Sequence, residues 1–400
     1  MSYAWNPWYS KGVQKKLPKA GIQYVPLPII SGNHCIPRLQ ILASQQAGLR
    51  RFALDFLCFS VRIAFSILRR AGFAALWNLI VFCHLLQKTK PDIVHINNGG
   101  YPGAWGVQQL ILAAEWIGMK RIIYTVNNQA LLPNGPLDKW MDRLVERNTA
   151  IFTTASRTAK ERLAAVRGMD PAKILQIVNA VVREYSVLSR KALLTGFFPS
   201  APIQRLDNLL VITQVGILTK RKGQRNTLAA VKHVISVVPD LRTKIKVFLV
   251  GNGEDESILR SLIAELELSD IVVLTGFRPD YIEFVAACDI YMQPSNGWED
   301  MPLVVLSAMQ CGKPVLGTAV AGLTEEVVHG KTGYLEDLGE RLDVRLGDRL
   351  LELYRDSKIR HQMGEMARER VDCCFSVHAV VKRYLELYED VLKGKAPTRA

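Results

Sequence analysis

The sequence predicts an α/β protein with parallel sheets, and two observations carry this prediction. Short apolar runs with the composition of buried strands alternate with amphipathic helical segments, an alternation that is typical of parallel sheets. The chain has 400 residues, 49% hydrophobic and 22% charged, which is long enough for two domains with sizeable cores. The predicted strands are 22–29, 92–96, 121–126, 150–155, 209–216, 246–251, 271–276, 290–295 and 314–319.

A domain boundary is predicted between residues 190 and 205, because two prolines and a glycine near this segment precede a new strand. Residues 1–190 would form the first domain and residues 205–375 the second. The segment 376–400 contains a helical pattern with Val, Tyr and Leu on one side. We therefore expect a separate final helix there.

Composition narrows the classes of function. The seven cysteines are scattered without the spacing of metal ligands, so we interpret them as reduced thiols and predict no metal site and no cofactor. The formal net charge of +14 suits nucleic acid, anionic lipid or polyanionic substrates. Neither zinc-finger spacing nor an aromatic-basic RNA motif is found, which argues against nucleic acid as a partner. No signal peptide is predicted, so we expect a cytoplasmic protein.

Residues 48–90 have a helical pattern throughout and combine aromatic and aliphatic residues with five arginines. Three interpretations remain open. We favour a basic amphipathic pair of helices that lies on an anionic membrane surface. The second interpretation is a pair of helices packed on a sheet, with the arginines in solvent. The third, a membrane span, is disfavoured because only 17 residues separate Arg70 from Lys88, and these include Asn78 and His84.

Two glycine-containing loops follow predicted strands of the second domain. Gly216 ends one strand and precedes the basic run 220–222, whose charges suit a diphosphate. Gly251 and Gly253 repeat the pattern before a helix that begins with acids. Taken alone, each loop is better explained as an ordinary strand–helix turn, and the acids by the helix dipole.

A carboxylate at the mouth of a predicted helix is more informative. Glu299 lies in a polar loop just before Pro302, a favoured residue type at the start of a helix. The backbone N–H groups of Leu303 and Val304 would be first-turn donors that can hold an anion. Glu299 would repel a diphosphate but would accept hydrogen bonds from sugar hydroxyls, so the pair suggests a nucleotide sugar. Alternatively, Glu299 only stabilises the helix dipole.

The segment 209–335 resembles the carboxyl-terminal domain of the group 1 (family four) retaining glycosyltransferases. The resemblance rests on the order and spacing of "VGILTKRKG", "VGNGEDE", "LTGFRPD", "PSNGWEDMPLVVLSAMQCGKPV" and "AGLTEEVVHGKTGYL". It implies a GT-B fold, in which two Rossmann-like domains face a cleft and the final helix returns to the first domain. The donor would then bind to the second domain and the acceptor to the first.

The resemblance also implies roles for particular residues. Catalytic roles fall to Glu299, Lys222 and Asn127. The implied donor-binding residues are Gly216, Arg221, Gly251, Gly253, Phe277, Arg278, Pro302, Leu303, Val304 and Ser307. The implied acceptor-side residues, in "PDIVHINNGGYPG", are Asn97, Asn98, Gly99 and Gly100.

Four departures from the family pattern bear on activity. Ser307 stands where the family commonly has a second Glu that holds the ribose, and Ile217 stands where many members have an Arg for the diphosphate. Asn127 replaces a common His, and an amide carries no proton at neutral pH. The usual first strand and Gly-rich loop also have no counterpart at the start of this sequence.

By resemblance, the expected function is metal-independent sugar transfer, with retention of configuration, from a nucleotide-diphosphate sugar. The expected acceptor is a lipid-linked glycan in surface polysaccharide assembly. The expected location is peripheral, on the inner face of the cytoplasmic membrane. The alternative is a GT-B-fold binding or scaffold subunit that has lost catalysis, and another GT-B enzyme such as a nucleotide-sugar epimerase is a third possibility.

Overall fold

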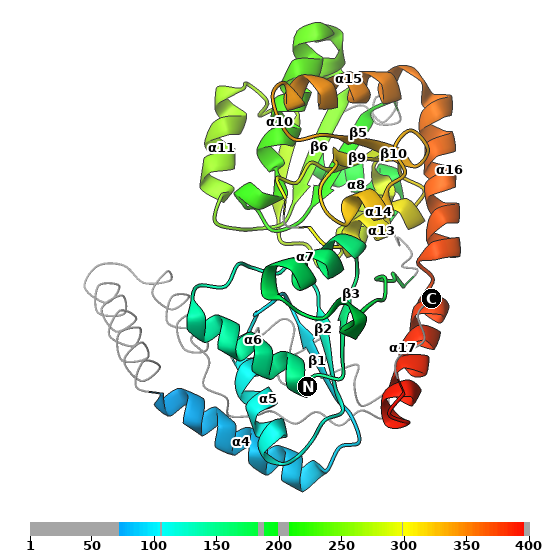
Figure 1. Ribbon diagram of the computed structural model, residues 1–400. Helices are drawn as coiled ribbons and strands as arrows, with labels where there is room; N and C mark the ends of the chain where they lie inside the picture. The colour runs from blue at the N-terminus through cyan, green and yellow to red at the C-terminus, as the bar shows by residue number, and fades with distance from the viewer. Residues whose placement is uncertain (1–71, 105, 183–187, 199–207, 298, 396–400) are drawn as a thin grey trace, which may run out of the picture. The chain divides into compact units, whose positions relative to one another are not determined.

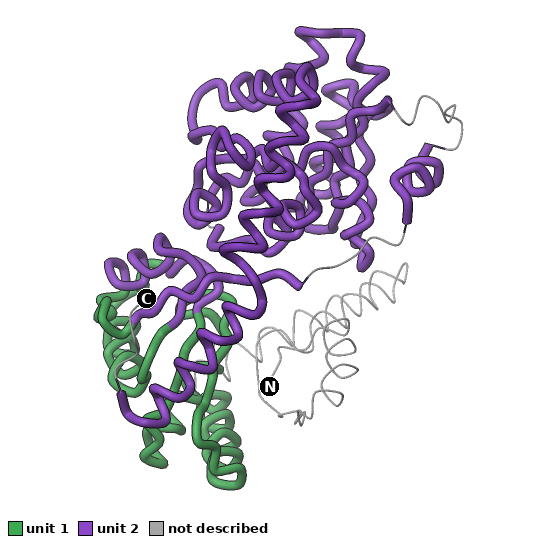
Figure 2. Tube along the Cα trace, turned by 90° about the vertical axis from the view of Figure 1, so that its right-hand side faces the viewer, with its two compact units in different colours: residues 1–125, 131–152, 167–173 green, residues 126–130, 153–166, 174–400 purple. Residues whose placement is uncertain are grey.

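The computed structural model describes residues 72–104, 106–182, 188–198, 208–297 and 299–395 (Figure 1). The chain divides into two compact units (Figure 2). Unit 1 takes the chain up to residue 125 together with 131–152 and 167–173. Unit 2 takes 126–130, 153–166 and the chain from 174 onward. The predicted domain limits at 190, 205 and 375 stay a prediction.

The first sheet is parallel, with the strand order β1-β2-β3-β4. Its two inner strands have sequences rich in β-branched and aromatic residues, "IIYTV" and "IFTT", and every residue in them is buried. The strands are β1 (Val94–Asn98), β2 (Ile122–Val126), β3 (Ile151–Thr154) and β4 (Ile174–Gln176). The helices along this part of the chain are α4 (Phe73–Thr89), α5 (Gly106–Trp116), α6 (Pro136–Asn148) and α7 (Arg157–Arg167).

The second sheet has six parallel strands in the order β10-β9-β8-β5-β6-β7. This is the doubly wound order 3-2-1-4-5-6 of dinucleotide-binding folds, written from the other edge. The direction of winding reverses between β5 and β8, which lie side by side. The strands are β5 (Leu210–Val215), β6 (Ile245–Val250), β7 (Val272–Gly276), β8 (Ile290–Gln293), β9 (Val315–Thr318) and β10 (Gly333–Glu336).

Both faces of the second sheet are covered by helices. On β5, Leu210 and Ile212 pack into one apolar cluster and Val211 packs into the other, as the period of two in a strand requires. The first cluster draws residues from α10 (Gln224–Val237), α11 (Glu256–Glu265) and α15 (Leu342–Arg355). The second draws residues from α8 (Arg190–Phe197), α12 (Tyr281–Ala287), α13 (Leu303–Gln310) and α16 (Ser357–Cys374). The remaining helices are α14 (Leu323–Glu326) and α17 (Val377–Leu392).

The predicted α/β class with parallel sheets is confirmed. Eight of the nine predicted strands are present, and the ninth, 22–29, lies outside the described residues. The prediction missed β4 and β10, which have only three and four residues and lie at sheet edges. The expected final helix is α17; its predicted packing on the first domain stays a prediction.

Most of the predicted membrane-associated region, 48–90, lies outside the described residues. Its last part forms α4, a helix of 17 residues. Among the residues that the structure describes, no helix combines the length and the apolar character that crossing a bilayer requires.

Candidate active site

The candidate site lies at the carboxyl ends of β5 and β8. In open α/β sheets, ligands bind outside the carboxyl ends of the strands at the point where the winding reverses. In unit 2 that point is the gap between the loop after Val215 and the loop after Gln293. The fold therefore brings together the basic run and Glu299, which are separated by more than seventy residues in the sequence.

The loop after β5 forms a tight basic turn. Lys220–Lys222 make one turn of 3₁₀ helix, which ends at Gly223 with a φ of 68°. A side chain at Gly223 would place its Cβ 1.8 Å from the carbonyl oxygen of Pro294, so this position requires glycine. The buried amide of Gln214 on β5 donates to the carbonyl of Lys222 at 2.7 Å and fixes the turn.

The loop after β8 is tied to this basic turn by hydrogen bonds. The backbone N–H of Asn296 donates to the carbonyl of Arg221 at 2.8 Å, and its side-chain amide donates to the carbonyl of Lys220 at 2.6 Å. Asn226 at the start of α10 donates to the carbonyl of Pro294 at 2.9 Å. These hydrogen bonds hold the loop after β8 against the basic turn after β5.

The carboxylate of Glu299 is the centre of the site. Its Oε1 accepts hydrogen bonds from Lys222 Nζ at 2.7 Å, Arg221 at 3.1 Å and the hydroxyl of Ser295 at 2.9 Å. Its Oε2 accepts from Lys222 Nζ at 3.0 Å. The side chain is only 5% exposed, so these charge-assisted bonds are shielded from water. The two cations predicted to hold a diphosphate are thus paired with the predicted sugar-binding acid.

Two further carboxyl groups lie close to this cluster. Burial raises the pKa of Asp300 to about 6, although the hydroxyl of Ser156 favours its ionised form. Burial raises the pKa of Glu326 well above its ordinary value, and the charges of Glu299 and Asp300 act in the same direction. Glu326 is fully buried, and neither carboxyl oxygen has a hydrogen-bond partner within the described part of the chain. Both groups bind a proton more tightly than they would in water.

The helix mouth has the predicted form. Pro302 caps α13 with extended backbone angles, and the helix begins at Leu303. Leu303 is exposed and Val304 is half-buried, so the first turn of this helix lies at the protein surface of unit 2. A helix terminus of this kind provides N–H donors for an anion.

Three residues predicted to bind the donor also have structural contacts of their own. Ser307 is buried, and its hydroxyl donates to the carbonyl of Leu303 at 3.1 Å. Added Cβ atoms at Gly251 and Gly253 would lie 2.0 and 2.2 Å from the carbonyl oxygens of Gly216 and Leu218, so these two glycines allow neighbouring loops to pack. Their contacts with the donor stay predictions.

The remaining residues predicted to bind the donor follow the carboxyl ends of β5 and β7. Gly216 ends β5, and a Cβ there would make only ordinary contact with the side chain of Lys222. Phe277 is half exposed. Arg278 forms a two-pronged ion pair with Asp280, and its hydrogen bonds lower the pKa of that carboxyl. Ile217, at the family's Arg position, is exposed and adds no cation.

The predicted acceptor-side residues follow β1 in unit 1. Asn97 and Gly99 are exposed and Gly100 is half-buried, as a ligand-facing loop requires. Asn98 is only 4% exposed and bonds within its own loop, so its side chain supports this loop from below the surface; its acceptor-side role stays a prediction. Asn127 directly follows β2 and is exposed.

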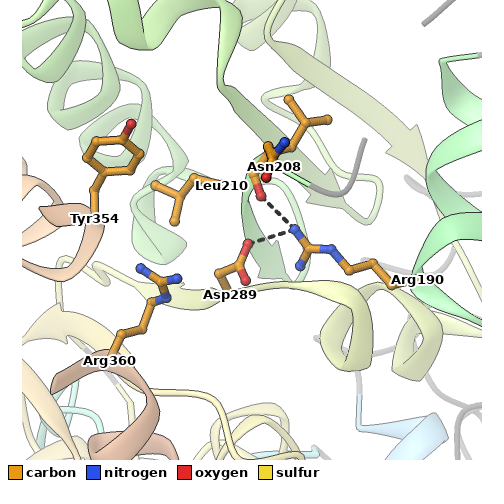
Figure 3. A pocket seen from close by; sticks show the side chains of 7 residues that line it. Arg190, Asn208, Leu210, Asp289, Tyr354 and Arg360 are labelled. Atoms are coloured by element: carbon orange, nitrogen blue, oxygen red, sulfur yellow. Dashed lines mark hydrogen bonds and ion pairs between the residues drawn. The ribbon is translucent and has the colours of Figure 1, made fainter. Parts of the chain in front are cut away.

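A separate cavity of about 380 Å³ opens at the start of β5, the edge of the sheet opposite to Gly216 (Figure 3). Figure 3 shows Arg190 directed at its wall, where it donates to the carbonyl of Leu209 and to Asp289. A third bond joins it to the carbonyl of Ala287. We interpret Arg190 as a structural link between α8 and the strand starts.

The fold and the switch-point site define a class of protein, the GT-B glycosyltransferases, to which similar solved structures belong. Alr3699/HepE of Anabaena in complex with UDP covers 78% of this chain and 82% of its own, with a TM-score of 0.63 and 19% identity. A glycosyltransferase from Rickettsia africae covers 81% and 83%, with a TM-score of 0.64 and 19% identity. At this level of identity the likeness establishes the fold, and the predicted GT-B architecture is confirmed.

The family follows from the sequence. The profile "Glycosyl transferases group 1" matches residues 201–370, and "Glycosyltransferase Family 4" matches residues 38–185. The chain belongs to the group 1, family four glycosyltransferases, as its motifs predicted.

Two curated relatives are similar over different lengths. The N-acetyl-alpha-D-glucosaminyl L-malate synthase of Bacillus anthracis is 34% identical over 165 residues, which are 41% of this chain and 42% of that enzyme. The match therefore spans less than half of that enzyme. The UDP-Gal:alpha-D-GlcNAc-diphosphoundecaprenol alpha-1,3-galactosyltransferase of Escherichia coli is 25% identical over 96% of this chain and 100% of that enzyme.

Several functional groups were missed at the sequence level. Ser295 and Glu326 lie against the cluster, and although both belong to motifs quoted above, neither was singled out as a site residue. Gln129 donates to the main-chain oxygen of Glu299 at 3.3 Å, and it stands 170 residues away in the sequence. Ser295 was assigned to the predicted strand 290–295, whereas β8 ends at Gln293, so nothing in the sequence marked this hydroxyl.

Proposed function

We propose that this glycosyltransferase moves a sugar from a nucleotide-diphosphate sugar to a lipid-linked glycan in surface polysaccharide assembly, with retention of configuration. The E. coli relative acts, by its name, on a GlcNAc-diphosphoundecaprenol acceptor and aligns with nearly the whole chain. Other relatives are named for lipopolysaccharide core and colanic acid biosynthesis. These names support a lipid-linked acceptor of the same chemical class.

The observation that carries the proposal is the Glu299 cluster at the switch point of the second sheet. Lys222 and Arg221 can neutralise the charge that develops on a leaving diphosphate, and the first turn of α13 adds N–H donors. Glu299, released from these partners, can accept hydrogen bonds from the sugar hydroxyls. The cluster thus contains groups for both parts of a nucleotide sugar.

The test is transfer by the purified full-length protein. A panel of UDP-, GDP- and dTDP-sugars is combined with a water-soluble lipid-diphosphate N-acetylglucosamine, and the product's anomeric configuration is read by NMR. Transfer with the donor's own anomeric configuration supports the proposal. Inversion, or no transfer with any donor under conditions where the protein binds UDP, contradicts it.

We propose that the reaction needs no metal, because the cationic side chains at the site can take the role that a divalent ion has in other transferases. Transfer in the presence of EDTA is the measurement. Unchanged rates support this part of the proposal, and rates that fall with EDTA and return with added Mg²⁺ or Mn²⁺ overturn it.

We propose a peripheral location on the inner face of the cytoplasmic membrane. The helix α4 exposes Phe73, Leu76, Trp77 and Ile80, which follow one another at helical spacing on one side. Residues 1–71 contain ten Lys or Arg and a single acid, Asp55, which gives this part of the sequence most of the net charge. Apolar and basic groups together suit an anionic bilayer.

Liposome flotation tests the membrane proposal. The protein should float with phosphatidylglycerol vesicles at low salt and less so at high salt. Replacing Phe73 and Ile80 by Ser should weaken this binding, whereas Leu385→Ser, at an equally exposed position on α17, should leave it unchanged. Failure of the wild-type protein to float with the vesicles at low salt would contradict the membrane proposal.

A second candidate is a binding subunit without catalysis. It is favoured by one observation: Ser307 is buried, so the family's ribose-holding carboxylate has no substitute on α13. This version predicts calorimetric binding of UDP with neither transfer nor slow hydrolysis of any UDP-sugar.

A further inference from the structure

Two neighbouring strands of the first sheet end beside each other at one edge. β1 ends at Asn98 and β2 at Val126, and these strands are adjacent in the sheet. The turn 99–104 therefore leaves the edge at which ligands of open α/β sheets bind. The backbone N–H of Leu131, beyond β2, donates to the carbonyl of Tyr101 at 2.9 Å and ties the two connections together.

The amide of Asn98 is fully used inside this turn. Its Nδ2 donates to the hydroxyl of Tyr124 at 2.7 Å and to the carbonyl of Pro102 at 3.1 Å. Its Oδ1 accepts from the backbone N–H groups of Gly99 at 3.0 Å and Ala104 at 3.1 Å. An asparagine amide offers two donors and an oxygen with two acceptor positions, so every group has a partner.

The turn is also shaped around this side chain. Gly103 has a φ of 67°, and a Cβ added there would lie 2.1 Å from Asn98 Nδ2. Tyr124 is buried, its hydroxyl donates to the carbonyl of Pro102 at 3.2 Å, and its ring packs 5.6 Å from that of Phe152. The amide of Asn98 thus links the turn to the packed, buried rings of Tyr124 and Phe152.

We propose that Asn98, supported by Tyr124, is a positioning residue that holds the turn 99–104 in the shape that receives the acceptor sugar. The inference rests on the proposed function, and it adds to the implied acceptor side the residue that holds the turn in shape. The turn exposes the small, uncharged residues Gly99, Gly103 and Ala104, and β1 exposes Asn97 just before it. Neutral amide and peptide groups suit uncharged hydroxyls, so the turn recognises a sugar ring rather than a diphosphate.

The experiment compares Asn98→Asp with Asn148→Asp in the full-length protein. The first variant keeps the size of the side chain and removes both N–H donors. The second changes a residue that is equally buried in unit 1 and donates to Leu144 at 2.9 Å, but precedes the amino end of β3. The KM for the lipid-diphosphate N-acetylglucosamine acceptor, the Kd for UDP, and amide hydrogen exchange at Gly99 and Ala104 are measured for each.

For Asn98→Asp we expect the acceptor KM to rise at least about tenfold, because the hydrogen bonds from Nδ2 to Tyr124 and to Pro102 are both lost. The Kd for UDP should change less than about twofold, and the two amides should exchange faster. Asn148→Asp should leave the acceptor KM unchanged. Faster exchange without a rise in KM, or an equal rise for both variants, overturns the proposal.

A second variant and a direct binding measurement also test the positioning role of Asn98. Should Asn98→Asp fail to fold, Gly103→Ala disturbs the same turn from the opposite side and should give the same split between KM and Kd. Should the wild-type protein transfer nothing, the proposed function fails, and acceptor binding is then measured directly by NMR. Loss of that binding in Asn98→Asp supports the positioning role, whereas unchanged binding or no binding by the wild type overturns it.

Discussion

The carboxyl edges of the two sheets are built from different chemistry. At the edge of the second sheet, Lys222 and Arg221 face Glu299 in a nearly buried ion cluster. At the edge of the first sheet, the neutral amide of Asn98 holds a turn through four hydrogen bonds. Lys222 and Arg221 must release Glu299 before they can bind an anion. The turn that Asn98 holds needs no such exchange of partners. The contrast suits a charged donor at one edge and an uncharged sugar at the other.

The largest effect is expected at Lys222. Lys222→Ala removes the cation that is closest to Glu299, so transfer should fall by about two to three orders of magnitude, as for other groups that stabilise charge in a transition state. UDP should also bind more weakly. Steady-state transfer rates and calorimetry provide the measurements, with Lys358→Ala, an exposed lysine on α16, as the control. A loss of less than about threefold in kcat would remove Lys222 from the site.

A smaller effect, on stability, is expected at Glu326. Its pKa is raised in the folded protein, so the folded state holds a proton that the unfolded state releases above about pH 4.5. Its contribution to stability is therefore fully present below that pH and decreases as the pH rises. Glu326→Gln should raise the Tm at pH 8 and leave it nearly unchanged at pH 4.

The control for this prediction is Asp280→Asn. The hydrogen bonds from Arg278 lower the pKa of Asp280, so its contribution is present at neutral pH and is lost as the pH falls. The Asp280→Asn variant, at a half-buried position, should therefore lose a little stability at pH 8. Thermal unfolding followed by circular dichroism at both pH values tests the pair. A pH-independent gain for Glu326→Gln would contradict the assignment.

The smallest effect is expected at Ser307. Because its hydroxyl bonds to the carbonyl of Leu303 within α13, Ser307→Ala should change the Kd for UDP by less than about twofold. Calorimetry of the variant beside the wild type gives the answer. A tenfold loss of affinity for UDP would show that Ser307 contacts the nucleotide and would contradict this prediction.

Much of the fold followed from the sequence because its signals are local. The apolar runs around Val211 and Phe248 identify buried strands without any tertiary information. The edge strands β4 and β10 were missed because their sequences, "ILQ" and "GYLE", contain only two apolar residues each and form no clear apolar run.

The candidate site was predicted in part. Motif spacing placed Lys222 and Glu299 in one site, and the structure joins them at 2.7 Å. Their mutual pairing was not predicted, because charge compensation depends on side-chain geometry across two loops. For the same reason the motif assigned Asn98 to the ligand, although its amide lies 2.7 Å from Tyr124, twenty-six residues away in the sequence.

The central claim is that Glu299 neutralises the diphosphate-binding cations until the donor arrives. Calorimetric titration of UDP into the wild type and Glu299→Gln tests it most directly. The variant keeps the size of the side chain and frees the charges of Lys222 and Arg221, so we expect UDP to bind about tenfold more tightly while sugar transfer is lost. Unchanged or weaker UDP binding by Glu299→Gln would contradict the account.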